Sequence, residues 1–122
     1  MYDNVKTIKQ AQKESQLLRE ISSLFMKTSA DDPRLMTLTI NRVSMSSDKG
    51  YCSVYFYTPG GIKEFEKLLE VLKLYKPSLR AALAKSIQAR YTPQLIFKFD
   101  EQYEKEDKMN KLLNSLKEKG EL

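Results

Sequence analysis

The chain has 122 residues, of which 41% are hydrophobic and 30% are charged, with 21 basic and 16 acidic side chains. This length supports one domain with a single core, and the hydrophobic content excludes a disordered chain. No stretch approaches the roughly 20 apolar residues that a transmembrane helix needs, and the N-terminus lacks the apolar segment of a signal peptide. The single cysteine, Cys52, excludes an internal disulfide and suits a reducing compartment. We therefore expect residues 1–122 to form one cytoplasmic domain with no membrane partner.

Catalysis is the function that the composition supports least. The chain has no histidine, which removes the commonest general base and the commonest metal ligand. With only one cysteine as well, a zinc site is not expected, and no glycine-rich phosphate loop occurs. The acidic pairs Asp31–Asp32 and Asp100–Glu101 are interpreted as solvated surface groups. We expect no enzyme, no metal, no cofactor and no small-molecule substrate.

A long helix is predicted at the start of the chain. Residues 3–27 contain no Gly or Pro, and Asp31-Asp32-Pro33 ends the helix because the residue before a proline disfavours helical geometry. The apolar positions recur at helical spacing and form one stripe of Leu17, Leu18, Ile21, Leu24 and Phe25.

The first turns of this helix differ from the rest. Val5 and Ile8 lie off the apolar stripe, so about the first eight residues are expected to fray or to stand away from the core. Lys6, Lys9 and Lys13 share one face of these turns. This pattern predicts either a solvated face or a functional cluster.

Two strands follow and are expected to pair as a hairpin. In the segment Leu35–Met45 the apolar alternation changes phase, which predicts a β-bulge near Asn41-Arg42. Residues 46–50 form a turn. In Tyr51–Tyr57, alternate residues face opposite sides of a sheet.

The second half of the chain predicts two helices, a third strand and a closing helix. Apolar residues from Ile62 to Leu72 mark the first of these helices, Pro77 interrupts it, and a further helix is expected from about Ser78 to Ala89. The strand covers residues 94–99. A short amphipathic helix spans Met109–Leu116, and about the last five residues are expected to fray.

The predicted order α-β-β-α-α-β-α corresponds to an α+β domain. A strand that returns to the same sheet after a helical crossover should lie parallel to the strand before the crossover. We therefore expect a three-stranded sheet, with its third strand parallel to its second and with helices on one face.

One contiguous stretch, residues 71–99, excludes negative charge. It contains no Asp or Glu and six basic residues, which are Lys73, Lys76, Arg80, Lys85, Arg90 and Lys98. Folding does not require such a distribution, whereas a densely anionic partner would benefit from it. A membrane surface would need a second apolar face, but Leu79, Leu83 and Ile87 are needed for the core. The stretch therefore favours nucleic acid.

Several residues of this region allow more than one interpretation. Arg90 projects close to the apolar line of its helix, so it is either a nucleic-acid contact or a structural anchor. Ala81 and Ala84 either permit close approach of a phosphodiester backbone or reflect helix propensity alone. The tyrosines of the second strand either stack on bases or cover the open face of the sheet and pack against the last helix.

Four motifs together resemble the bacterial ribosome-binding factor A family. They are L-R-x-x-L-x-x-x-I-x-x-R-x-T-P-x-L-x-F-x-x-D at 79–100, D-P-R-L at 32–35, V-S-M-S-S-D at 43–48 with V-Y at 54–55, and M-x-x-L-L-x-x-L at 109–116. The resemblance covers about residues 4 to 118 in the family's order.

The resemblance implies a KH-like domain of type II topology and a non-catalytic factor that binds the small ribosomal subunit through its rRNA. In the family this contact lies near the base of the central region and the decoding end. It is associated with late subunit maturation, rRNA processing and cold adaptation, and the factor leaves before translation starts. The expected RNA contacts are Lys73, Lys76, Arg80, Lys85 and Arg90, with Arg42, Lys6, Lys9 and Lys13 more peripheral.

One segment departs from the family pattern. Where members have small residues, Ala-x-Gly, between the two central helices, this chain has Tyr75-Lys76-Pro77. Close approach of RNA to this break is therefore in question, and the alternative is that Lys76 contacts a phosphate through its side chain. A rival function is a protein-interaction module in which the tyrosine face or the last helix docks a partner and the basic charge aids solubility. We expect a monomer in either case.

Overall fold

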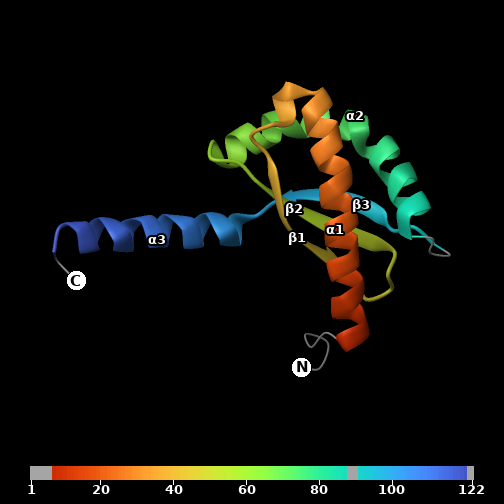
Figure 1. The fold of residues 1–122 in the computed structure, drawn as a ribbon, viewed down its shortest axis with the longest axis horizontal. Helices are drawn as coiled ribbons and strands as arrows, with labels where there is room; N and C mark the ends of the chain where they lie inside the picture. Colours follow the sequence, from red (N-terminus) through yellow and green to blue (C-terminus); the bar gives the residue numbers. More distant parts are fainter. Residues whose placement is uncertain (1–6, 88–90, 121–122) are drawn as a thin grey trace.

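The structure is a computed structural model and describes residues 7–87 and 91–120. The elements in chain order are α1 (Ile8–Asp31), a 3-10 helix η2 (Pro33–Leu35), β1 (Thr39–Met45), β2 (Tyr51–Tyr57), α2 (Gly61–Ile87), β3 (Gln94–Phe99) and α3 (Glu101–Glu118). Figure 1 shows α1 and α2 gathered about a small sheet, with α3 extending away from it. The predicted α+β class is confirmed.

The sheet has the strand order β1-β2-β3. β1 pairs antiparallel with β2, and β3 pairs parallel with β2, as the crossover argument predicts. The register of the hairpin passes from Ile40 opposite Phe56 to Arg42 opposite Tyr55, so Asn41 is the extra residue of a bulge. Both the parallel third strand and the bulge are confirmed.

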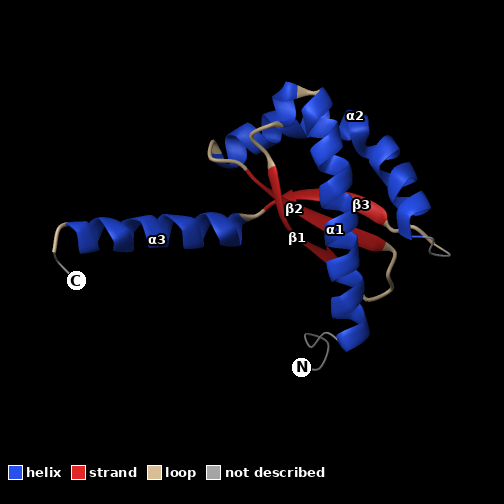
Figure 2. Ribbon diagram, viewed as in Figure 1, coloured by secondary structure: helices blue, strands red, loops and turns tan. Residues whose placement is uncertain are grey.

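One face of the sheet carries the core. Val54 and Phe56 on β2 are paired across the sheet with Phe97 and Phe99 on β3, and all four side chains are buried. Helices α1 and α2 contribute the buried residues Leu17, Ile21, Phe25, Leu72, Leu79 and Leu83. Figure 2 shows α1 crossing this face. The opposite face carries the alternate residues of the strands and remains partly open.

Helix α1 ends at Asp31, directly before the Asp32-Pro33 step, as predicted. Thr7 caps its first turn by accepting a hydrogen bond from the Gln10 N–H at 3.1 Å. Ile8 is 79% exposed, in keeping with its position off the apolar stripe. The expected fraying at the ends falls largely on residues 1–6 and 121–122, outside the described residues.

The first strand is shorter than predicted. It begins at Thr39 and not at Leu35, because Pro33 starts a 3-10 turn instead of an extended segment. The N–H groups of Met36 and Leu38 donate to the carbonyls of Pro33 and Leu35 at 3.2 and 3.1 Å. Leu35 and Leu38 are buried in this turn.

The prediction of two helices separated at Pro77 is wrong. α2 is one helix of 27 residues with Pro77 inside it. Proline removes one intrahelical hydrogen bond and bends a helix, and Figure 1 shows α2 changing direction along its course. Leu72 on one side of the proline and Leu79 on the other are both buried in the same core. This packing holds the two halves together as one bent helix.

Helix α3 is longer than the predicted short segment and none of its residues is buried. It starts at the Asp100 carboxylate, which accepts a hydrogen bond from the Tyr103 N–H at 3.1 Å. Its apolar residues Met109, Leu112 and Leu113 are exposed. None of the described helices is both long and apolar enough to span a membrane.

Candidate nucleic-acid interface

The sheet brings several segments together at one of its ends. β1 finishes there at Met45 opposite Cys52, and β2 and β3 begin there with Tyr51 paired to Gln94. α2 also finishes on this side, immediately before the loop into β3 (Figure 1). The first turns of α1 reach the same end, because the buried Glu14 carboxylate accepts a hydrogen bond from the Met45 N–H at 2.7 Å. We call this region, with its Lys9, Lys13, Lys49 and Lys85, the basic end.

A hollow of about 410 Å³ lies against the last turns of α2 at the basic end. It is lined by Pro77, Arg80, Ala81, Ala84, Tyr91 and Thr92. The short side chains of the two alanines leave space in the hollow. Tyr91 lies at its edge and is 75% exposed. Lys85 follows Ala84 on the helix and is exposed. The arrangement leaves room for a phosphodiester backbone beside a cation.

Arg80 lines this hollow and also makes hydrogen bonds that stabilise the fold. Its Nη2 donates to the Thr92 carbonyl at 2.8 Å and its Nε donates to the Pro93 carbonyl at 3.2 Å. These bonds tie α2 to the loop that leads into β3. Arg80 is thus a structural anchor of the kind considered for Arg90, which itself lies outside the described residues.

Lys73 and Lys76 lie further from the basic end, near the middle of α2. Lys73 forms an exposed ion pair with Glu70 at 3.3 Å, a type of pair that contributes little and yields readily to a stronger anion. The Lys76 ammonium lies 5.1 Å from the centroid of the Phe97 ring, within reach of a cation–π interaction. Lys76 is half-buried, so its charge is directed partly toward the sheet.

Arg42 lies on the open face of the sheet, away from the hollow. Its guanidinium carbon is 3.8 Å from the centroid of the Tyr55 ring, and its Nε and Nη2 donate to Asp100 at 3.2 and 3.3 Å. Burial alone would raise the pKa of Asp100, but the hydrogen bonds from Arg42 and the Tyr103 N–H outweigh it and hold that pKa below its usual value. Arg42 thus links β1 to the start of α3.

The interpretation of the acidic pairs as solvated groups is wrong for two of the four residues. Asp100 is only 2% exposed and carries the contacts with Arg42 and α3. Asp32 is also buried and accepts hydrogen bonds from Arg34 and Tyr75. In both cases a carboxylate supports the fold by capping a helical turn and pairing with an arginine.

The tyrosines of β2 divide between packing and exposure. Tyr57 packs against Tyr103 of α3, with ring centroids 4.7 Å apart, and its hydroxyl donates to Asp107 at 3.3 Å. Tyr55 is covered by Arg42, and the Lys98 ammonium lies 5.8 Å from the Tyr55 ring centroid. Tyr51 is exposed. The interpretation of Tyr57 as a packing residue against the last helix is confirmed.

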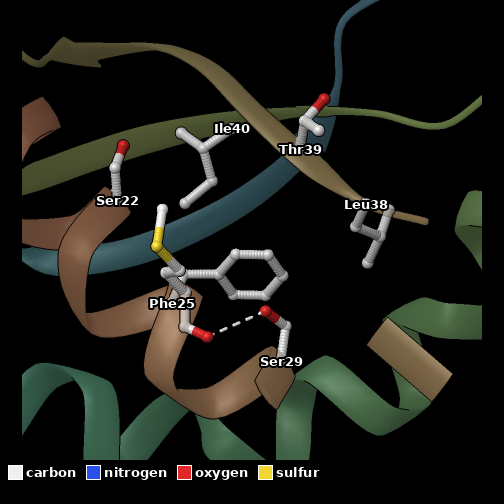
Figure 3. A pocket seen from close by; sticks show the side chains of 7 residues that line it. Ser22, Phe25, Ser29, Leu38, Thr39 and Ile40 are labelled. Atoms are coloured by element: carbon white, nitrogen blue, oxygen red, sulfur yellow. Dashed lines mark hydrogen bonds between the residues drawn. The ribbon is translucent and has the colours of Figure 1, made fainter. Parts of the chain in front are cut away.

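A further hollow, of about 260 Å³, lies between the second half of α1 and the start of β1, and its lining is uncharged (Figure 3). Four of the seven residues that line it are apolar, namely Phe25, Met26, Leu38 and Ile40. The Ser29 hydroxyl already donates to the Met26 carbonyl at 3.0 Å. With no cation in its lining, this hollow is unsuited to a phosphate.

Among the sequence-predicted site residues, Lys9 and Lys13 reach the basic end from α1, whereas Lys6 lies outside the described residues. Lys49, in the β1–β2 turn, is a cation of the basic end that sequence reasoning missed. The turn itself was predicted, but its proximity to α1 depends on the Glu14–Met45 contact. Within the described residues, no group of three or more His, Cys, Asp or Glu side chains could hold a metal ion.

The fold and the site together define a small α+β domain with four lysines, Lys9, Lys13, Lys49 and Lys85, at one end of its sheet, an arrangement suited to a polyanionic partner. The model of the ribosome-binding factor A family matches residues 9–113. The chain is 30% identical to ribosome-binding factor A of Coprothermobacter proteolyticus over 118 residues, which cover 97% of this chain and 85% of that relative. The chain belongs to the ribosome-binding factor A family.

Solved structures give the same relationship. The crystal structure of ribosome-binding factor A from Thermus thermophilus is 34% identical, with a TM-score of 0.62 over 72% of this chain and 92% of that chain. A homology model of the Thermus thermophilus factor, fitted into a cryo-EM map of a 30S complex, is 35% identical with a TM-score of 0.51. It covers 75% of this chain and 91% of that chain.

Proposed function

We propose that this protein binds the small ribosomal subunit through rRNA and supports late maturation of the subunit and processing of its rRNA. Through this role it supports growth in the cold. It acts in the cytoplasm as a non-catalytic monomer without a cofactor or a small-molecule substrate. The observation that carries the proposal is the hollow beside Ala81 and Ala84, bordered by the acid-free second half of α2. The relative fitted into a 30S complex supports the choice of partner.

The contacts would fix position and would not read bases. Lysine side chains pair with phosphate oxygens irrespective of sequence, so selectivity for one rRNA site comes from RNA shape and from neighbouring ribosomal proteins. Lys85 is the first candidate because it is exposed and belongs to none of the ion pairs among the described residues. Lys73 can exchange Glu70 for a phosphate at small cost.

The test is co-sedimentation with purified small subunits across a salt series. The variant Lys73→Ala/Lys85→Ala is compared with Lys63→Ala/Lys67→Ala, which removes the same charge from exposed positions at the other end of α2. We expect wild-type binding to weaken steeply with salt, and the logarithmic salt slope to fall by about 0.7 to 0.9 for each phosphate that the variant no longer neutralises. The control pair should bind like wild type.

Two results would reject the proposal. Equal weakening in both double variants would mean that net charge alone, and not this surface, accounts for binding. Binding unaffected by salt would favour the protein-interaction alternative, because apolar docking surfaces are not screened by ions. The maturation role is tested separately by the amount of precursor small-subunit rRNA in cells that carry each variant, with growth in the cold as a second measurement.

A further inference from the structure

A second hollow at the basic end, of about 550 Å³, lies between the first turns of α1 and the turn that joins β1 to β2. It is lined by Thr7, Lys9, Gln10, Lys13, Met45, Ser46, Ser47 and Lys49. Three of these residues are lysines, contributed by two segments far apart in the chain. We call this hollow the lysine cleft, after Lys9, Lys13 and Lys49.

The two walls of the lysine cleft are fixed to each other. The Glu14 carboxylate, buried on α1, accepts the hydrogen bond from the Met45 N–H at the end of β1. Lys9 and Lys13 are one helical turn apart on α1 and therefore point to the same side. The buried contact next to Lys13 keeps that side against the hairpin turn.

The opposite wall is also well defined. In the turn, the Asp48 carboxylate accepts hydrogen bonds from the Ser46 hydroxyl at 2.7 Å and from the Gly50 N–H at 2.9 Å. Lys49 has a φ of 62°, in the left-handed region that glycine adopts freely and a lysine rarely does. The turn thus holds a cation at a position where a glycine would fit with less strain.

The three lysines of the lysine cleft outnumber the two carboxylates next to them in the chain, those of Glu14 and Asp48. None of these lysines takes part in an ion pair within the described part of the chain. The Asp48 carboxylate in the same turn is engaged by Ser46 and Gly50. Three cations around one hollow repel each other, and an anion placed among them would relieve that repulsion.

The position of the lysine cleft favours a nucleic-acid backbone as this anion. The Gly50 carbonyl accepts a hydrogen bond from the Gln94 N–H at 2.9 Å, so the turn of the cleft adjoins the loop that borders the α2 hollow. The two hollows therefore both border this end of the sheet. A strand of linked phosphates can occupy both, whereas a single small anion can fill only one.

We propose that the lysine cleft is a second phosphodiester-binding site, in which Lys9, Lys13 and Lys49 contact the backbone of the same rRNA that lies on α2. This inference rests on the proposed function and extends it from one surface to two. Thr7 and Ser47, both exposed at the rim, supply hydroxyl donors to the phosphates.

The first experiment compares Lys13→Ala/Lys49→Gly with the control Lys63→Ala/Lys67→Ala. Glycine at 49 removes the charge and relaxes the backbone, so the variant is expected to remain folded. In co-sedimentation with small subunits we expect about a ten-fold loss of affinity and a logarithmic salt slope lower by about 1.5 than that of the control. Affinity equal to that of the control would overturn the proposal.

The second experiment uses RNA without ribosomal proteins. A short single-stranded RNA is titrated into isotope-labelled protein, and the amide signals of Thr7, Gln10 and Ser47 are expected to shift in wild type and to stay in place in the variant. Shifts confined to α2 would overturn the cleft proposal while leaving the proposed function intact. Amide shifts at the lysine cleft in a protein that does not bind small subunits would reject the proposed function but keep the cleft as an RNA-binding site. Subunit binding that depends on the cleft without RNA shifts there would assign it to an acidic protein partner and overturn the proposal.

Discussion

The Tyr75 hydroxyl donates a hydrogen bond of 2.6 Å to Oδ2 of Asp32, which joins α2 to the turn after α1. Arg34 pairs with the same carboxylate, with Nε 2.9 Å from Oδ1. The family resemblance predicts a small residue at position 75, so the bulk of Tyr75 raised the question of whether it blocks RNA. Its ring is turned inward and packs against the core. Tyr75 therefore makes a structural contact between α2 and the turn after α1.

Replacing Tyr75 with Phe should lower stability without affecting RNA binding. The ring keeps its packing, but Asp32 loses one of its donors and a buried carboxylate becomes less well satisfied. We expect a lower urea midpoint with an unchanged m-value, measured by circular dichroism. Small-subunit binding by the same variant is the control, and a loss of binding at constant stability would mean that Tyr75 itself contacts RNA.

Asp32 should give the fold a defined acid sensitivity. Hydrogen bonds from Arg34 and Tyr75 hold the pKa of this carboxyl well below its ordinary 3.8. A group with a depressed folded-state pKa stabilises the fold above its unfolded pKa, and this contribution is lost as the pH falls through the folded value. Wild type should therefore lose stability below about pH 4, and Asp32→Asn should lose less over the same range.

The difference between the two proteins is the quantity to measure, because the pKa values of Asp48, Glu64 and Asp100 are also lowered and contribute to acid unfolding in both. Urea unfolding at a series of pH values gives the free energy of unfolding of each protein, and hence this difference. A constant difference between wild type and Asp32→Asn from neutral to acid pH would contradict the prediction.

Local patterns in the sequence account for most of the fold. Cys52, Val54 and Phe56 alternate with polar or aromatic positions, and a period of two assigns them to one face in any sheet. The bulge at Asn41 follows from the same argument, since the alternation changes phase there. Pro77 shows the limit of such arguments. A proline predicts a helix break locally, but the core contacts of α2 on both sides of it keep one helix continuous.

The candidate site was less accessible to sequence reasoning because its geometry depends on distant partners. The buried Asp100 accepts a hydrogen bond from Arg42, which is 58 residues away in the chain. The anchoring of Arg80 depends on where the carbonyls of Thr92 and Pro93 lie in the fold, which no local pattern encodes. Lys49 was recognised only as part of a turn, because the approach of α1 to that turn is a tertiary contact.

Alanine substitutions at Arg80 and at Lys85 should affect stability to different extents. Arg80→Ala removes two hydrogen bonds to the carbonyls of Thr92 and Pro93, and we expect the free energy of unfolding to fall by about 1 to 3 kcal/mol. Lys85→Ala affects an exposed residue and should change it by less than about 0.5 kcal/mol. Denaturant unfolding gives both values, and co-sedimentation with small subunits shows the effect of each on binding.

Arg80→Lys is the matched control for this pair. It keeps the positive charge but cannot reproduce the planar fork that reaches both carbonyls. Stability should fall nearly as far as in Arg80→Ala. Full stability in Arg80→Lys would mean that the charge, and not the pair of hydrogen bonds, holds the loop.

Helix α3 should be dispensable for folding beyond its first turns. Tyr103 and Asp107 contact Tyr57, but none of the residues of α3 is buried. A chain that ends after Lys108 should therefore unfold with a free energy within about 0.5 kcal/mol of wild type, while its far-ultraviolet circular dichroism loses helical signal. If the basic end accounts for subunit binding, this shortened chain binds with the same salt dependence as the full chain. Loss of binding at unchanged stability would instead assign the contact to the exposed apolar residues of α3, as the protein-interaction alternative requires.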